Sequence, residues 1–195
     1  GAPFRARIHY CSSFPVFDNQ PFLRELERFI LTDMGSHILD VARFLFGEAR
    51  SVYCLTHRVT PGIAGEDVAT VVMAMERATV TCEISYASKT EIERFPETFV
   101  FVECERGSVE LAPDYWLRVT TERGTHARRV PPPRYAWADP AYDVVHASIA
   151  AANADFLRAL RTGTPPETTG EDNLKTVRLV FAAYESAEQN QVIHL

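Results

Sequence analysis

The chain has 195 residues, of which 46% are hydrophobic and 24% charged, values that are ordinary for a globular domain with a sizeable core and that argue against disorder. Its formal net charge is -6 and its basic residues are scattered, so nucleic acid is a poor candidate partner. No apolar run approaches the roughly 18 residues of a membrane span, and the N-terminus lacks the pattern of a signal peptide, so we expect a soluble, cytoplasmic domain without a membrane partner.

The first elements of the chain can be predicted from simple patterns. Residues 4–11 alternate between apolar and polar side chains, which predicts a half-buried strand. Two prolines and several turn-forming residues over 12–21 predict an irregular loop. A short helix is expected over 22–29, and a second helix is expected over 33–46 with its end at Gly47.

The rest of the chain changes from strands to long helices. Segments rich in β-branched and aromatic residues predict strands at 51–58, 67–75, 79–87, 98–104, 108–111 and 115–121. Long helical patterns follow at 142–161 and at 169–189, the second capped by Thr169. A final short strand is expected at 192–193.

This order of elements predicts one α+β domain over residues 1–195, with an open, mostly antiparallel mixed sheet and the helices on one face. Neither a repeat nor a long linker divides the chain. Strand 67–75 carries apolar residues on both faces, in Val68, Val71, Val72, Met73 and Met75. Because an apolar sheet face must be covered, we predict a homo-oligomer formed through the sheet.

Candidate catalytic residues lie near the start of the helix expected over 33–46, where Thr32 or Asp33 is the predicted cap. Asp33, His37 and Asp40 have the spacing i, i+4 and i+7, which in an α-helix aligns them on one stripe. Alcohol oxidation needs a base for the hydroxyl proton, and an imidazole exchanges protons near neutral pH. A carboxylate one turn earlier can hold a substrate hydroxyl.

The same spacing has simpler interpretations. Asp33 can be a helix cap and His37 a satisfied histidine with no chemical role. A metal centre is disfavoured, because local spacing offers these two ligands and no third, so no metal site is predicted. A metal-dependent lyase or isomerase remains a further alternative.

No cofactor-binding residues are expected within this sequence. Its nine glycines never occur as G-x-G, so it has neither a dinucleotide-binding turn nor a phosphate-binding loop. Any cofactor-binding half must therefore lie outside these 195 residues.

Several segments together resemble the Gfo/Idh/MocA oxidoreductases, the glucose-fructose oxidoreductase and inositol dehydrogenase family. Residues 28–47 contain the motif D-x-G-x-H-x-x-D followed by a glycine, and 65–69 resemble the start of a central strand. The family's closing helices are resembled by 153–166, 169–174 and 182–187. The resemblance covers nearly the whole chain, and it implies the C-terminal substrate and oligomerisation domain of a protein whose N-terminal Rossmann domain, which holds NAD or NADP, is absent here.

The resemblance also implies roles for individual residues. It assigns catalysis to Asp33, His37 and a lysine of an E-K-P motif, which this sequence lacks, so the isolated chain is expected to be inactive. It suggests substrate contacts at Asn19 and Gln20, although Asn19 is equally compatible with a turn-stabilising role. Asp40 and Tyr86 are further candidate substrate contacts, but Tyr86 is also suited to a core or an interface.

We therefore expect the full-length protein to be an NAD(P)-dependent oxidoreductase acting on a small-molecule substrate, namely a sugar, a polyol or a related hydroxyl or carbonyl compound. His37 would be the acid and base, and Asp33 its positioning partner. The alternative is a binding or assembly module that keeps the fold and performs no redox step.

Overall fold

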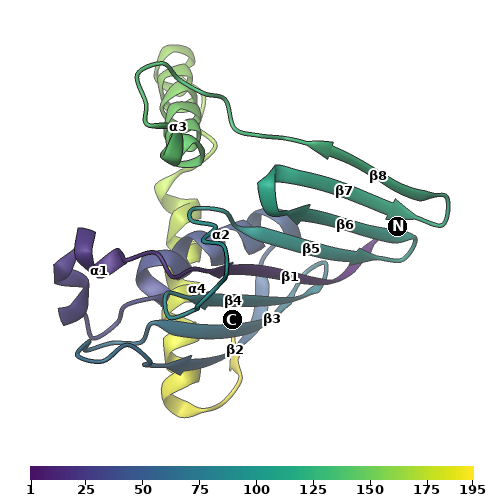
Figure 1. Cartoon of the computed structure of the whole chain (residues 1–195). Helices are drawn as coiled ribbons and strands as arrows, with labels where there is room; N and C mark the ends of the chain where they lie inside the picture. The colour runs from purple at the N-terminus through teal and green to yellow at the C-terminus, as the bar shows by residue number, and fades with distance from the viewer.

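The centre of the fold is a 9-stranded open sheet in which only the neighbours β1 and β4 run parallel. A computed structural model describes residues 1–195, and the strand order is β8-β7-β6-β5-β1-β4-β3-β2-β9 (Figure 1). The strands are β1 (Pro3–Cys11), β2 (Ala49–His57), β3 (Val68–Met75), β4 (Thr79–Ser85), β5 (Phe99–Cys104), β6 (Gly107–Ala112), β7 (Trp116–Thr121), β8 (Gly124–Arg129) and β9 (Ile193–His194). The predicted fold class, an α+β domain with a mostly antiparallel mixed sheet, is confirmed.

The sequence predicts every strand except β8. This strand pairs with β7 from Thr121 and Gly124 onward, and all of its side chains are exposed. Because β8 buries no side chain, it has no apolar alternation from which a strand could be predicted.

Two of the helices cover one face of the sheet, as predicted. The helical elements are α1 (Val16–Asn19), the 3-10 turns η1 (Pro21–Glu25), η3 (Pro113–Tyr115) and η4 (Pro140–Tyr142), the π-helical turn η2 (Leu31–Gly35), α2 (Ser36–Phe46), α3 (Asp143–Thr162) and α4 (Gly170–Gln189). Helices α2 and α4 pack against each other and the sheet, whereas α3 stands clear of the sheet beyond the start of α4 (Figure 1). No helix combines the length and apolar character that a membrane span requires.

The long helices end where the sequence predicts. Gly163 follows α3 with a left-handed φ of 70°, a conformation that favours glycine. At the start of α4, the Thr169 hydroxyl accepts a hydrogen bond from the Asp172 N–H, with a distance of 3.2 Å.

The helix predicted over 22–29 is wrong beyond the short turn η1. The N–H groups of Phe29 and Ile30 donate to Glu66 in a distant segment, so they cannot close helical turns of their own. Thr32 and Asp33 are not helix caps either, since η2 already includes both residues and runs directly into α2.

The two faces of the sheet differ in character. Val71, Met73 and Met75 are buried beneath the helices, so only Val68 and Val72 of the predicted two-sided apolar set lie on the open face. Strand register aligns a row across that face consisting of Tyr53, Val72, Thr81, Arg7, Phe101, Glu110 and Arg118. The open face is thus mixed in polarity, and the homo-oligomer stays a prediction.

Candidate functional site

Asp33 lies in a π-helical turn that continues directly into α2. The Gly35 N–H donates to the Ile30 carbonyl five residues earlier at 2.7 Å, and the Asp33 N–H donates to the Phe29 carbonyl at 2.9 Å. A π-turn is wider than an α-turn, so the predicted i, i+4, i+7 stripe does not apply across it. Single π-turns inside helices occur frequently at functional sites.

The Asp33 carboxylate is partly buried and has a defined partner. The hydroxyl of Tyr86, which directly follows β4, donates to Asp33 Oδ2 at 2.7 Å. Burial, together with the adjacent Asp33 charge, raises the pKa of Tyr86 above its ordinary value. The phenol therefore stays protonated and continues to donate to Asp33.

His37 occupies the first turn of α2 and is exposed. Its imidazole makes no hydrogen bond or ion pair within the chain, so both ring nitrogens can meet a ligand. Neither His37 nor Asp33 lies in the hydrophobic core. No three His, Cys, Asp or Glu side chains come together in a group suited to a metal ion.

Aromatic rings surround the Tyr86 end of the site. Phe29 stacks on Tyr86 with 5.7 Å between ring centroids, and Phe17 of α1 contacts Phe29 at 5.5 Å. Tyr10 meets Tyr86 edge-on at 6.2 Å, and its buried hydroxyl has no hydrogen-bond partner in the chain. Tyr10 could not be singled out from the sequence, because strand alternation assigns it only to the core.

Asn19 and Gln20 lie at the end of α1, which Phe17 holds against Phe29. Both residues are exposed, and neither side chain makes a hydrogen bond within the chain. The Gln20 backbone joins α1 to η1, since its N–H donates to Val16 and its carbonyl accepts from Leu23. Their side chains are therefore free to contact a ligand, and substrate binding by them stays a prediction.

A loop after Tyr86 is joined to the segment after β1 by Glu93. The Glu93 carboxylate accepts hydrogen bonds from the Ser12 hydroxyl at 2.9 Å and the Ser13 N–H at 2.7 Å. Phe95 stacks on Phe14 with ring centroids 4.0 Å apart. Burial alone would raise the pKa of Glu93, but these hydrogen bonds outweigh it and lower the pKa to about 2.

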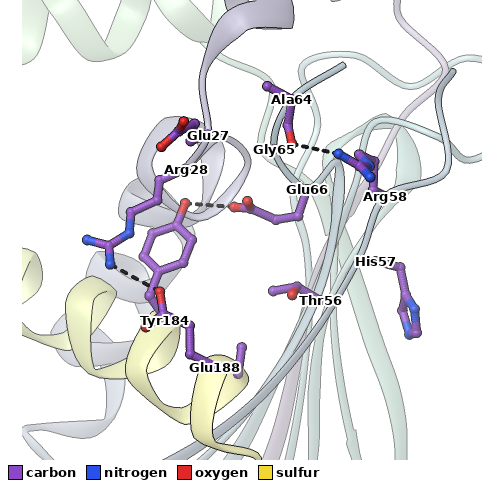
Figure 2. Close-up of a pocket in the computed structure, with 11 residues that line it drawn as sticks. Glu27, Arg28, Thr56, His57, Arg58, Ala64, Gly65, Glu66, Tyr184 and Glu188 are labelled. Atoms are coloured by element: carbon purple, nitrogen blue, oxygen red, sulfur yellow. Dashed lines mark hydrogen bonds and ion pairs between the residues drawn. The ribbon is translucent and has the colours of Figure 1, made fainter. Parts of the chain in front are cut away.

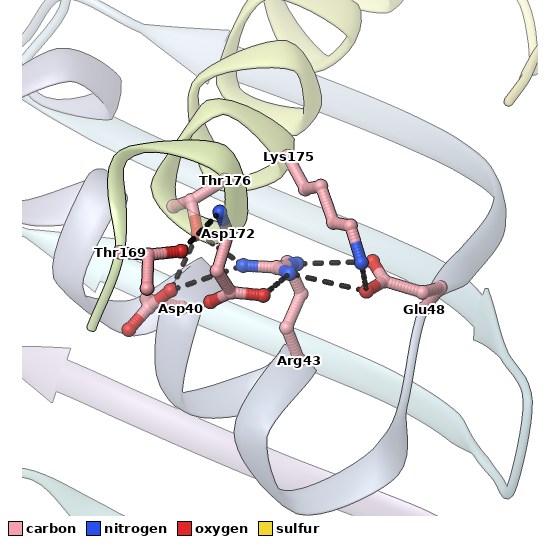
Figure 3. Close-up of polar contacts among 7 residues, drawn as sticks. All are labelled: Asp40, Arg43, Glu48, Thr169, Asp172, Lys175 and Thr176. Atoms are coloured by element: carbon pink, nitrogen blue, oxygen red, sulfur yellow. Dashed lines mark hydrogen bonds and ion pairs between the residues drawn. The ribbon is translucent and has the colours of Figure 1, made fainter. Parts of the chain in front are cut away.

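Asp40 contacts an arginine instead of Asp33 or His37. Arg43, which is 7% exposed, donates to Asp40, Glu48 and Asp172, and so ties α2 to the start of α4 (Figure 3). The Thr176 hydroxyl also donates to Asp40. These contacts favour a structural role for Asp40, and its predicted substrate contact remains untested.

The chain is similar to known proteins over its whole length. Residues 1–110 match the model of the GFO/IDH/MocA C-terminal domain. Over 196 aligned residues the chain is 42% identical to D-apiose dehydrogenase of Paraburkholderia graminis and 39% identical to D-apiose dehydrogenase of Rhizobium rhizogenes. It covers 52% and 57% of these relatives, so the chain spans about half the length of the curated proteins it matches.

A solved structure shares the fold closely. The crystal structure of an oxidoreductase from Agrobacterium radiobacter in complex with NAD+, L-tartaric acid and magnesium superposes with a TM-score of 0.96 at 39% identity. The match covers 100% of this chain and 57% of that one. Together with the family model, it shows that the chain belongs to the GFO/IDH/MocA C-terminal domain family.

Proposed function

We propose that this chain is the substrate-binding half of an NAD-dependent sugar dehydrogenase. The observation that carries the proposal is the pairing of an anchored acid with a free base on one helical segment. Asp33 is held by Tyr86 at 2.7 Å, and the exposed His37 follows four residues later. An acid fixed in place four residues before an unpartnered imidazole is suited to hold a hydroxyl group that the imidazole deprotonates.

The chemistry requires only one proton acceptor from this chain. When the alcohol is oxidised, its carbon–hydrogen bond breaks and the hydrogen leaves with the electron pair as hydride. The hydroxyl proton goes to the His37 imidazole, the carbon–oxygen bond becomes a carbonyl, and the imidazolium then releases its proton to solvent. Asp33 accepts a hydrogen bond from the substrate and keeps the reacting hydroxyl beside His37.

A bound nicotinamide cofactor supplies the hydride acceptor. Because this chain has no G-x-G turn, we assign the cofactor's phosphates to residues outside positions 1–195. NAD is favoured over NADP, since the similar oxidoreductase from Agrobacterium radiobacter was crystallised with NAD+. The isolated chain should accordingly be inactive.

A pentose such as D-apiose is the first substrate to test, because both curated relatives are D-apiose dehydrogenases. Asn19 and Gln20, exposed beside the aromatic rings, are proposed to contact the sugar hydroxyls. The open sheet face is proposed to bind a second copy of the protein, since Leu55, Val72 and Phe101 are exposed there.

The test is a substrate screen of the full-length protein, following the absorbance of the reduced nicotinamide with D-apiose, other sugars and cyclitols, each with NAD+ and with NADP+. Turnover of a sugar with NAD+ that is lost in His37→Ala supports the proposal. An absence of turnover with every substrate would favour a binding or assembly module without redox activity, whereas full activity in His37→Ala would overturn the role of His37 as the base.

A further inference from the structure

The N–H groups that begin the catalytic helical segment are bound by a residue from a distant part of the chain. The first N–H groups of any helix lack partners within that helix. Here the partner is Glu66, next to the start of β3. We infer that Glu66 is a positioning residue that holds Asp33 in place for catalysis, an inference that rests on the function proposed above.

Glu66 binds three consecutive peptide N–H groups. Its carboxylate Oε1 accepts from the N–H groups of Phe29 and Leu31, both at 3.2 Å. Its backbone carbonyl accepts from the Ile30 N–H at 3.1 Å. Hydrogen bonds from peptide groups to a carboxylate are stronger than neutral ones, so this arrangement fixes the backbone over residues 29–31.

The same peptide groups hold Asp33 on their opposite side. The carbonyl of Phe29 accepts from the Asp33 N–H at 2.9 Å, and the carbonyl of Ile30 accepts from the Gly35 N–H at 2.7 Å. A shift of residues 29 and 30 would therefore carry Asp33 with it. The π-turn is thus anchored by Glu66 before the chain enters α2.

Glu66 is itself held rigidly. The residue is 9% exposed, and the hydroxyl of Tyr184 in α4 donates to its Oε1 at 2.6 Å (Figure 2). Gly65 permits this approach, because a Cβ at that position would lie 2.4 Å from the Leu26 carbonyl oxygen. Glu66 is therefore fixed by both its own backbone and α4.

Asp67, which follows Glu66, positions Tyr86, the hydrogen-bond partner of Asp33. The Asp67 carbonyl accepts from the Tyr86 N–H at 3.0 Å, and the Asp67 carboxylate accepts from the N–H groups of Val59 and Thr60. Residues 65–67 thus bind both the backbone that leads into Asp33 and the backbone of Tyr86. One short segment sets the relative position of the two site residues.

The experiment measures turnover by the full-length enzyme with NAD+ and the sugar found in the screen. Glu66→Ala should lower kcat by about 10-fold or more and leave the KM for NAD+ within about 2-fold, because displacement of a catalytic group acts on the chemical step. Glu66→Gln keeps an acceptor oxygen and should recover most of the loss. Glu27→Ala is the control, since Glu27 lines the same surface pocket (Figure 2) and its side chain makes no hydrogen bond to the turn.

A double mutant separates positioning from general stability. If Glu66 acts through Asp33, then adding Glu66→Ala to Asp33→Asn should lower kcat by less than about 3-fold. If Glu66→Ala lowers kcat by the same factor in the wild-type protein and in Asp33→Asn, the inference is overturned while the proposed function stays intact. Unchanged turnover in Asp33→Asn would instead overturn the proposed function.

Two further measurements keep the inference testable if Glu66→Ala folds poorly or if no sugar is turned over. Tyr184→Phe removes only the hydroxyl that holds Glu66. This substitution should lower kcat less when it is added to Asp33→Asn than when it is made in the wild-type protein. Hydrogen exchange of the Asp33 and Gly35 amides should be fastest in Glu66→Ala, intermediate in Glu66→Gln and slowest in Glu27→Ala. Unchanged protection in both Glu66 variants contradicts the inference without reference to activity.

Discussion

The hydroxyl of Tyr86 donates a 2.7 Å hydrogen bond to Oδ2 of Asp33, and it joins the end of β4 to the π-turn before α2. One oxygen of the carboxylate is therefore engaged by a phenol whose pKa is raised by burial and by Asp33 itself. The hydrogen bond aims the carboxylate in a defined direction while the exposed edge of Asp33 stays open to a ligand.

Removing this hydrogen bond should impair catalysis more than folding. Tyr86→Phe keeps the ring stacking on Phe29, so we expect a loss of unfolding free energy of about 1 kcal/mol but a drop in kcat of about 10-fold. Steady-state kinetics and urea unfolding of the full-length protein provide the two values. Tyr53→Phe, which removes a 2.7 Å hydrogen bond from β2 to Asn190 at the end of α4, is the matched control. Equal kcat values in both variants would mean that Asp33 needs no alignment by Tyr86.

Arg43 should be a major source of stability between α2 and α4. It is buried, and its loss would leave Asp40 and Asp172 without their cation and Glu48 with Lys175 alone, although the three carboxylates are half exposed. Arg43→Ala should therefore lower the unfolding free energy by about 2 kcal/mol, less than for a fully buried pair. Arg118→Ala, which breaks an exposed pair with Glu110, should cost at most about 0.5 kcal/mol.

Asp40 offers a check on the same cluster, because it was also a candidate substrate contact. Asp40→Asn should weaken the bonds to Arg43 and Thr176 and leave the KM for the sugar unchanged. A large rise in that KM would instead indicate that Asp40 contacts the substrate.

Glu93 should make the stability of the loop beside the site depend on pH. Its folded-state pKa of about 2 lies below the ordinary 4.5, so ionised Glu93 stabilises the fold above pH 4.5 and the contribution is lost as the pH falls toward 2. Urea unfolding at about pH 6 and about pH 3 should show a smaller acid-induced loss in Glu93→Gln than in wild type. Glu91→Gln, on the same exposed loop, should behave like wild type, and identical acid sensitivity of all three proteins would contradict this role of Glu93.

The strands and long helices could be predicted because local patterns determine them. Alternation marks β1, Gly163 marks the end of α3, and Thr169 marks the start of α4. The remaining features of the fold depend on contacts between residues that are distant in the sequence. The parallel pairing of β1 with β4 leaves no local signal, and β8 buries no side chain.

The residues of the candidate site could be predicted from the sequence, but most of their contacts could not. The spacing of Asp33 and His37 is visible in the sequence, but the π-turn depends on Glu66, more than thirty residues away. Asp40 turns toward Arg43 because Thr176 and Asp172 of α4 meet it there. Tyr86 was a candidate for substrate binding, and its contact with Asp33 required the fold to bring the two together.

The open sheet face should hold two copies of the protein together. Leu55 is 45% exposed on β2, near one edge of this face, and a charge there would be buried against the second copy. Light scattering of the full-length protein should give an oligomer, and Leu55→Lys should shift it toward the monomer. Leu160→Lys, at an exposed apolar position on α3, should leave the mass unchanged. A monomeric wild type would rule out the assembly.

Asp33 and His37 are proposed to act together on a sugar hydroxyl, and the kcat of Asp33→Asn and of His37→Ala in the full-length protein tests this directly. Both variants should lose at least about 100-fold in kcat while the KM for NAD+ stays within about 2-fold. Wild-type kcat in either variant would contradict this proposal.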